Sequence, residues 1–376
     1  MKIIILGAGL VGSPMAIDLA KDSEFSVTAV DNKKEPLELL EKNYNIDTIR
    51  ANLLESKTVK KLVANYDLVI SAVPGFMGFR TLKTVIEAGK NVVDIAFFPE
   101  DPFQLDELAK KNKVTAVIDC GVAPGMSNIL IGYEYEKFQK INSAVIYVGG
   151  LPEVRELPFE YKAVFSPSDV IEEYLRPARY IQDGKLIVKK ALTEPEIINF
   201  SEVGSLEAFN TDGLRTLAHT LSIPNMKEKT MRYPGHIDKI KLLKEMGLFS
   251  KEEIEINGCE VRPIDLTTKL LFPHWKLEKG DSDITIMRIE IRGSKDGKEQ
   301  EVTYELFDKY DEETGIHSMA RTTGYTATMT ARIIAKDLYS NWGIIAPEYL
   351  GNNPAMVEYI LKGLEERGVI YKRFEK

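Results

Sequence analysis

The chain has 376 residues, which is more than one ordinary hydrophobic core organises, so we expect two domains of common size. Its 44% hydrophobic and 28% charged residues are typical of a soluble globular protein, and the absence of a long apolar run or a leader pattern predicts a cytoplasmic protein without a membrane partner. A formal net charge of −8 disfavours nucleic acid as a partner, and two cysteines without a CxxC pair argue against a disulfide framework and a zinc site, so we expect no metal.

The first predicted strand, residues 2–6, runs straight into a glycine-rich turn. The continuous apolar run Ile3-Ile4-Ile5-Leu6 suits a strand that is buried on both faces. It is followed by Gly7-Ala8-Gly9-Leu10-Val11-Gly12, in which the first glycine permits a tight turn, the second lets the backbone approach a pyrophosphate, and the third lets the next helix pack closely. A helix over residues 13–21 would then direct free N–H groups at the phosphates.

Asp31 ends the second predicted strand, residues 25–31, 19 residues after Gly12. A carboxylate at this place fits the ribose hydroxyls of NAD and repels the 2′-phosphate of NADP. The sequence therefore predicts an NAD site at the glycine loop. The alternative is a Rossmann-like domain that has lost its cofactor.

Strand and helix patterns continue to alternate up to about residue 150. Polar amphipathic segments such as 55–65 and 101–111 separate most of the strands, and this alternation predicts a parallel sheet with helices on both faces. Ligands bind outside the carboxyl ends of such strands, which places Ala72-Val73-Pro74-Gly75, Asp94 and Asp119-Cys120-Gly121 around the crevice. The further strands are expected at residues 46–51, 67–73, 91–96, 114–119 and 143–148.

The alternation stops after Gly149-Gly150-Leu151-Pro152, and loops that contain proline appear. Two alternating runs, 284–292 and 300–310, flank Asp296-Gly297, which is a strong hairpin signal. We expect an antiparallel sheet that forms a second, substrate-side domain, followed by helices at 322–336 and 354–367. Other strand patterns lie at residues 160–165, 185–189 and 229–233.

The predicted fold class is therefore α/β, with a Rossmann-type parallel sheet domain and a second α+β domain whose sheet is mixed and largely antiparallel. The dinucleotide-binding domain is expected to cover residues 1–122 and to be completed by C-terminal elements in 322–376. Residues 123–321 are expected to form the substrate-binding and dimerisation domain.

A nicotinamide enzyme needs a group that accepts or gives a proton, and His236 is the preferred candidate. It follows Arg232-Tyr233-Pro234-Gly235, so a strand end and a turn deliver it to the start of a helix, where its pKa is lowered. The alternative is a histidine that only caps the helix. His274 and His317 are more often structural, and His219 fits either reading.

Charged side chains near the crevice are the candidates for holding an amino-acid substrate. Arg215 follows the turn at Asp212-Gly213 and can hold a carboxylate through two parallel hydrogen bonds, with Arg232 and Arg176 as competitors. Asp94 can take an ammonium group, or it can cap the following turn. In the loop over residues 121–128, Gly125 brings backbone N–H groups near the nicotinamide half of the crevice. Cys120 receives no role.

With these residues collected, the chain resembles the saccharopine dehydrogenase-like family of NAD(P)-dependent amino-acid oxidoreductases, and within it the lysine 6-dehydrogenases most. The resemblance covers nearly the whole length. The blocks outside the glycine loop are the specific ones, since no generic Rossmann motif contains them. The motifs that carry it are GAGLVG at 7–12, DCGVAPGMSNILIG at 119–132, YVGGLP at 147–152, EAFNTDGLRT at 207–216 and RYPGHIDKIKLL at 232–243.

The resemblance implies a homodimer, NAD as cofactor and a set of site residues. It favours Arg232 and His236 more than spacing alone does, and it places Gly125 near the nicotinamide riboside. We expect Asp212 and Gly125 in the substrate site with Arg215. The chain lacks the aromatic residue that saccharopine-forming relatives often carry directly after Pro74; Phe76 comes two residues later. The implied cofactor site consists of Gly7, Gly9, Leu10, Val11, Gly12, Asp31, Ala72, Val73, Pro74 and Met126.

The leading hypothesis is oxidation of the ε-amine of L-lysine with NAD as acceptor, with His236 as base and with Asp94 contacting an ammonium group. Water would then release ammonia and leave a semialdehyde that cyclises to piperideine-6-carboxylate. A first rival is reductive condensation of an amine with a carbonyl compound, as in saccharopine or carboxynorspermidine dehydrogenases. A second rival is a non-catalytic protein that senses NAD.

Overall fold

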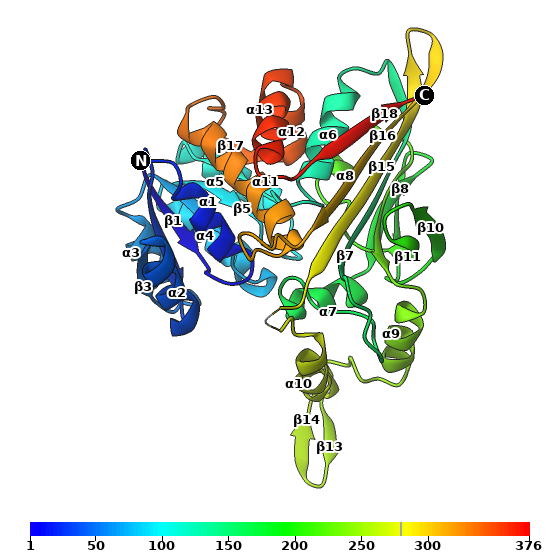
Figure 1. Ribbon diagram of the computed structural model, residues 1–376, viewed down its shortest axis with the longest axis horizontal. Coiled ribbons are helices and arrows are strands. Elements are labelled where there is room, and N and C mark those ends of the chain that lie inside the picture. Colours follow the sequence, from blue (N-terminus) through cyan, green and yellow to red (C-terminus); the bar gives the residue numbers. More distant parts are fainter. Residues whose placement is uncertain (279) are drawn as a thin grey trace.

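The computed structural model describes residues 1–278 and 280–376 and is organised around two sheets (Figure 1). The first sheet has seven strands in the order β17-β6-β5-β4-β1-β2-β3, and every pair in it is parallel. The second has nine strands and is mixed, because β7 and β12 run parallel while its other pairs are antiparallel. The predicted fold class is confirmed.

The first strand shows why this sheet is covered on both faces. Ile3 and Ile5 belong to one hydrophobic cluster and Ile4 and Leu6 to another, as alternation along a strand requires. Helices α1 and α11 pack on the first face, and α3, α4 and α5 on the second. The elements of this part are β1 (Lys2–Leu6), α1 (Gly12–Leu19), β2 (Ser26–Asp31), α2 (Lys34–Tyr44), β3 (Asp47–Arg50), α3 (Ser56–Val63), β4 (Leu68–Ser71), α4 (Gly75–Glu87), β5 (Asn91–Asp94), η1 (Pro102–Leu105), α5 (Asp106–Lys111), β6 (Thr115–Val117) and α6 (Met126–Tyr135).

The C-terminal segment contributes to both sheets. Strand β17 (Gly343–Ile345) extends the first sheet beside β6, whereas β18 (Tyr371–Glu375) pairs with β16 of the second sheet. Residues 322–376 were expected to complete the first domain. Strand β17 does extend its sheet, whereas β18 belongs to the second sheet. Helix α11 (Ser318–Ala335) lies between the two sheets and packs against α1, β4, β5 and β15 (Figure 1). Helices α12 (Pro347–Gly351) and α13 (Pro354–Glu365) pack near α6.

Strand β7 (Lys140–Pro152) is longer than predicted and lies in the other sheet, between β12 and β15. The predicted strand at 160–165 does not form. Tyr161, Ala163 and Val164 are buried there by packing of a loop, so the alternation of apolar residues imitates a strand without a pairing partner. The hairpin at Asp296-Gly297 is confirmed, since both residues have positive φ and join β15 (Asp283–Lys295) to β16 (Lys298–Lys309).

The remaining elements surround the second sheet or project from it. The pair β13–β14 projects from the body beyond α10 (Figure 1). Among the described residues, no helix combines the length and apolarity needed to cross a membrane. These elements are α7 (Pro167–Leu175), β8 (Ala178–Gln182), β9 (Lys185–Lys189), β10 (Glu196–Phe200), β11 (Gly204–Asn210), α8 (Leu217–Thr220), β12 (Met226–Arg232), α9 (His236–Glu245), β13 (Ile254–Ile256), β14 (Cys259–Val261) and α10 (Pro263–Trp275).

Candidate active site

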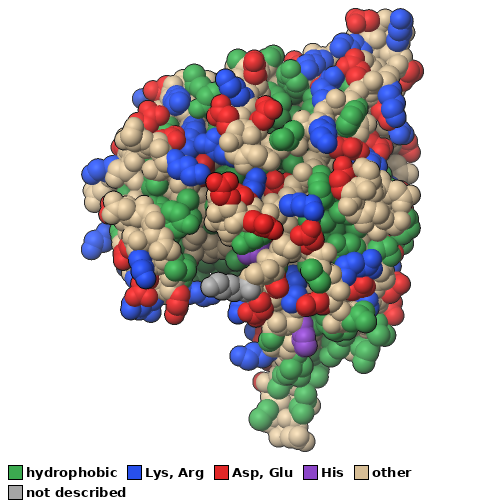
Figure 2. Space-filling model, in the orientation of Figure 1, with side chains coloured by type: hydrophobic (Ala, Val, Ile, Leu, Met, Phe, Trp, Pro, Cys, Tyr) green, Lys and Arg blue, Asp and Glu red, His purple; other side chains and the backbone are tan. Residues whose placement is uncertain are grey.

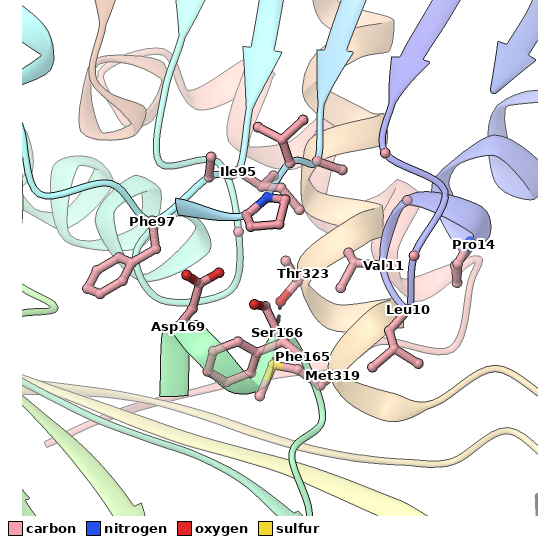
Figure 3. A pocket seen from close by; sticks show the side chains of 18 of the residues that line it. Leu10, Val11, Pro14, Ile95, Phe97, Phe165, Ser166, Asp169, Met319 and Thr323 are labelled. Carbon is pink, nitrogen blue, oxygen red and sulfur yellow. Dashed lines mark hydrogen bonds between the residues drawn. The ribbon is translucent and has the colours of Figure 1, made fainter. Parts of the chain in front are cut away.

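A cavity of about 1270 Å³ lies between the carboxyl ends of the first sheet and one face of the second. The surface is visibly hollowed between these two parts of the molecule (Figure 2). In the close view, Leu10 and Val11 enter from the start of α1, Met319 and Thr323 from α11, and Asp169 from α7 (Figure 3). The position outside the carboxyl ends of parallel strands is the one expected for a ligand site in this type of fold.

The glycine loop forms one end of the cavity and fits a dinucleotide. Gly7 has φ +104°, and a Cβ there would lie 2.5 Å from the carbonyl oxygen of Ala72. A Cβ on Gly12 would lie 1.9 Å from the carbonyl oxygen of Gly7, whereas one on Gly9 would meet nothing within 4 Å. Gly7 and Gly12 therefore permit close packing of the chain, and Gly9 leaves open space for a pyrophosphate.

The carboxylate of Asp31 lies beside the glycine loop at this end of the cavity. It accepts hydrogen bonds from the N–H groups of Ala8, at 2.8 Å, and Lys33, at 2.9 Å. These bonds hold the carboxylate against the turn that follows β1, where the ribose of a bound dinucleotide lies in folds of this type. A nicotinamide dinucleotide would be held here by the glycine loop, Asp31 and the strand end Ala72-Val73-Pro74, all of which line the cavity.

The loop that follows β6 lines the cavity through Asp119 and residues 121–124, whereas Gly125 and Met126, which were predicted from it, do not line it. Gly125 has φ +133°, and a Cβ there would lie 2.0 Å from the carbonyl oxygen of Gly121. Met126 is completely buried at the start of α6. Gly125 and Met126 therefore support the loop on the side away from the cavity. The aromatic residue Phe76, two positions after Pro74, is 70% exposed and lines the cavity.

One face of β12 forms the opposite wall of the cavity. Glu228, Thr230 and Arg232 alternate along this strand, so their side chains share a face, and all three line the cavity. The carboxylate of Glu228 accepts hydrogen bonds from the hydroxyl of Thr211, at 2.6 Å, and from the N–H of Gly213, at 3.1 Å. This wall thus presents a carboxylate, a hydroxyl and a guanidinium in that order.

The part of the cavity beyond the glycine loop is rich in carboxylates. Three of them are matched by an arginine: Asp119 by Arg215 at 3.0 Å, Asp212 by Arg179 at 2.7 Å, and Glu173 by Arg232 at 3.0 Å. Asp169 and Glu228 have no ion-pair partner among the described residues, although both are buried. Burial raises the pKa of Asp169 to about 6 and that of Glu228 to about 8.

Among the arginines predicted to hold a substrate carboxylate, Arg232 lines the cavity. Most N–H groups of its guanidinium already donate hydrogen bonds within the protein. Its Nη2 donates to Glu173 and Tyr161, its Nη1 to the carbonyl of Met231, and its Nε to the hydroxyl of Tyr174 at 3.2 Å. Arg215 does not line the cavity, because its guanidinium is occupied by Asp119 and by a backbone carbonyl. The cavity therefore offers an incoming carboxylate fewer free donors than the sequence leads one to expect.

His236 starts α9, as predicted, but it is completely buried and does not line the cavity. Its Nε2 lies 3.0 Å from the hydroxyl of Tyr174, and its Nδ1 lies 2.9 Å from the carbonyl oxygen of Phe159. Because that carbonyl can only accept, Nδ1 carries the hydrogen and Nε2 accepts from Tyr174. Burial lowers the pKa of His236 to about 3. Both ring nitrogens are occupied, so the imidazole contacts the cavity only through Tyr174 and Arg232.

Asp94 is likewise enclosed and does not reach the cavity. Neither of its carboxylate oxygens finds a hydrogen-bond partner among the described residues, and burial raises the pKa of Asp94 to about 8. The structure thus places this group in the wall behind the cavity and not beside an ammonium group of a substrate.

The structure also brings in three carboxylates that were not singled out from the sequence, namely Asp169, Glu173 and Glu228. No alternation marks Glu228, because Lys227 and Lys229 on either side of it are also charged and residues 227–230 are polar throughout. The predicted strand began at residue 229 and so left Glu228 out. Asp169 and Glu173 lie on α7, a helix that was not predicted from the sequence, and no local pattern marks them.

Two family models match the chain. A model described as "Saccharopine dehydrogenase NADP binding domain" matches residues 3–117, and one described as "Saccharopine dehydrogenase C-terminal domain" matches residues 121–369. The alpha-aminoadipic semialdehyde synthase of Bos taurus is 25% identical over 277 residues, which cover 70% of this chain and 30% of that protein. This chain therefore aligns with under a third of the length of that relative.

Two further similarities extend over whole chains. The carboxyaminopropylagmatine dehydrogenase of Synechocystis sp. is 21% identical over 396 residues and covers 98% of both chains. The apo structure of the saccharopine dehydrogenase (L-Glu forming) from Saccharomyces cerevisiae superimposes with a TM-score of 0.80 at 19% identity and covers 100% of this chain and 99% of that one. At this identity the second similarity establishes the shared fold.

Proposed function

Because the chain belongs to the saccharopine dehydrogenase family, we propose that it is a nicotinamide-dependent dehydrogenase that acts on a carbon–nitrogen bond of a small, positively charged amine. The observation that carries this proposal is the charge of the cavity. The space that fits a dinucleotide continues into a chamber lined by Asp169, Glu173, Thr211, Glu228 and Arg232. Among the residues that the structure describes, Asp169 and Glu228 form no ion pair there. A ligand that brings positive charge would stabilise the ionised form of these two carboxyl groups, which burial alone disfavours.

Within this class, we propose oxidation of the ε-amine of L-lysine as the reaction. Lysine carries two ammonium groups and one carboxylate, so its net charge complements the chamber. A saccharopine-type product carries additional carboxylates, and these would meet Asp169 and Glu228 in a chamber where Arg232 is already paired with Glu173. The charge of the site thus favours lysine over saccharopine.

The cofactor supplies a hydride acceptor when it is bound. The residues of this chain must bind the amine, remove its proton so that a lone pair is available, and keep the reacting carbon at the nicotinamide end near Pro74. Water addition to the resulting imine would release ammonia and leave the 6-semialdehyde, which cyclises on the α-amine. His236 is not proposed as the base, because it lies outside the cavity with both nitrogens occupied.

We propose NAD and not NADP as the cofactor. Asp31 supports this choice, since its carboxylate is fixed by two backbone N–H groups at the turn where the adenosine ribose would lie. A 2′-phosphate would add negative charge beside this carboxylate. The family model that matches residues 3–117 carries NADP in its description, and Asp31 is the feature of this chain that favours NAD instead.

A second candidate function is reductive condensation of an amine with a carbonyl compound, of the kind catalysed by saccharopine or carboxynorspermidine dehydrogenases. The alignment with carboxyaminopropylagmatine dehydrogenase over 98% of both chains favours it. A polyamine partner would also satisfy the carboxylates of the chamber.

One assay separates these proposals. We expect NADH to form when the protein is given NAD and L-lysine alone. Consumption of NADH only when an amine and 2-oxoglutarate or an aldehyde are both present would favour condensation. Binding of NAD without turnover of any amine would indicate a non-catalytic protein and would contradict both enzymatic proposals.

A further inference from the structure

The carboxylate of Glu228 is held in a fixed place by its surroundings. A Cβ on Gly213 would lie 2.3 Å from the carboxyl carbon of Glu228 and 2.4 Å from its Oε2, so a larger residue at position 213 would displace this carboxylate. The hydroxyl of Thr211 and the N–H of Gly213 both donate to that same Oε2. The turn over residues 211–213 therefore binds one carboxylate oxygen of Glu228, Oε2, through two hydrogen bonds.

The other oxygen of Glu228 has no such partner. Among the described residues no group donates to Oε1, and no arginine, lysine or histidine forms an ion pair with the side chain, which is only 4% exposed. Its two acidic neighbours, Glu173 and Asp212, are each held by an arginine. Glu228 is thus a buried carboxylate in the cavity wall with one oxygen available to a ligand.

Glu228 also shares its strand face with Arg232, a cation of the cavity lining. At about 3.3 Å per residue, the Cα atoms of Glu228 and Arg232 are on the order of 13 Å apart, with Thr230 between them. A ligand with an amine at one end and a carboxylate at the other can therefore lie along this face, its amine toward Glu228 and its carboxylate toward the remaining Nη1 hydrogen of Arg232.

We propose that Glu228 binds the reacting ammonium group of the substrate and accepts its proton, an assignment that rests on the proposed function. In this step one N–H bond of the ammonium group breaks and one O–H bond forms on Glu228. The nitrogen keeps the electron pair and becomes a neutral amine, and the carboxylate becomes a carboxylic acid. Glu228 holds a proton at pH 7, and this proton leaves to solvent when the ammonium group binds, so the transfer that follows balances in charge and atoms without any further reactant.

Three other groups fit this role less well. Both oxygens of Asp169 lie 3.3 Å from the N–H of Gly75, so neither is free of a donor as Oε1 of Glu228 is. Asp94 and His236 do not line the cavity. Asp169 remains the useful comparison, because it is the other unpaired carboxylate of the chamber.

The test is calorimetric titration of the protein, saturated with NADH so that no hydride can leave the ligand, with L-lysine and with L-norleucine, which lacks the ε-amine. At pH 7 the carboxyl of Glu228 is protonated, since burial raises its pKa to about 8. An ammonium group that binds there therefore displaces a proton. Titrations in buffers of different ionisation enthalpy count that proton.

For the unchanged protein we expect tighter binding of L-lysine than of L-norleucine and release of close to one proton. In Glu228→Gln, which keeps the volume and the acceptor for Thr211 and Gly213, we expect lysine affinity to fall at least tenfold, proton release to vanish and norleucine binding to stay the same. The control Glu290→Gln, on β15 and away from the cavity, should behave as the unchanged protein.

Unchanged lysine affinity and proton release in Glu228→Gln would overturn the assignment, as would loss of both in Asp169→Asn alone. Failure of the proposed function gives a different pattern. NADH would bind, but the unchanged protein would bind none of the amines and would oxidise none in the presence of NAD. That result would overturn the role of Glu228 together with the function on which it rests.

Discussion

Arg215 and Asp119 form a buried, bidentate ion pair that joins the loop after β11 to the loop after β6, and thereby one sheet to the other. The guanidinium also donates to the carbonyl of Phe98 at 2.7 Å. Both residues adopt positive φ, at +51° for Arg215 and +50° for Asp119, so the backbone is held in an uncommon conformation on each side of the pair. Asp119 lines the cavity, and Arg215 supports it from behind.

Replacement of Arg215 by methionine should therefore destabilise the fold. Asp119 would be left as a buried charge without a partner, and the expected loss in the free energy of unfolding is about 3–5 kcal/mol. Urea denaturation followed by circular dichroism measures it. The control Arg292→Met breaks an exposed pair with Glu301 and should cost about 0–1 kcal/mol. Equal losses in the two variants would contradict a structural role for the pair.

Asp31→Asn should shift the cofactor preference toward NADP. The amide still offers an oxygen to one of the two N–H groups of Ala8 and Lys33, but the negative charge that repels a 2′-phosphate is gone. We expect the ratio of NAD affinity to NADP affinity to fall by about tenfold or more, as measured by fluorescence titration. Asp67→Asn removes a charge that lies outside the cavity and serves as the control. An unchanged ratio in Asp31→Asn would exclude Asp31 as the selecting residue.

Tyr174 connects His236 to Arg232, and this predicts linked effects on substrate binding. Tyr174→Phe removes the hydroxyl that accepts from Arg232, and His236→Gln disturbs the acceptor of that hydroxyl. Both variants should raise KM for L-lysine by about threefold to tenfold and change kcat less. Because the residues act as a chain, the double variant should resemble Tyr174→Phe alone. A loss of kcat by a factor of 100 or more in His236→Gln, with intact NAD binding, would restore His236 as the base.

Stability should depend on pH through Glu228. Its pKa is raised to about 8 by burial, above the value of about 4.5 in the unfolded chain, so between these pH values the native state holds a proton that the unfolded state has released. The free energy of unfolding should therefore fall as pH rises from about 4.5 to 8. In Glu228→Gln this fall should become shallower, by on the order of a few kcal/mol across the window. Parallel pH profiles for the two proteins would show that Glu228 does not titrate in this range.

The cofactor half of the site followed from the sequence more closely than the substrate half. Its signals are local: the spacing of Gly7, Gly9 and Gly12 and the position of Asp31 depend on neighbouring elements of one sheet. The nine residues predicted for it from the glycine loop, Asp31 and the end of β4 all line the cavity. Met126 was also predicted for the cofactor site but does not line the cavity, because Gly125 turns the chain back on Gly121. This turn depends on a φ of +133° at Gly125, which the sequence does not reveal.

The substrate half depends on contacts between distant segments, which residue types alone do not reveal. Arg215 carried the right chemistry for an anchor, but Asp119, 96 positions away, occupies its guanidinium. His236 stands where predicted, at the start of a helix, and Tyr174 and Phe159 enclose it there. The carboxylate of Glu228 lies in the cavity wall because Gly213, which has no side chain, leaves space beside it.

The most direct measurement uses L-lysine that carries deuterium on its ε-carbon, mixed with the protein and NAD. We predict that deuterium appears in the reduced nicotinamide, detected by mass spectrometry, that ammonia is released in equal amount, and that the rate falls relative to unlabelled lysine. Formation of no reduced cofactor from L-lysine or from any other ω-amine, by a protein that binds NAD, would contradict the account.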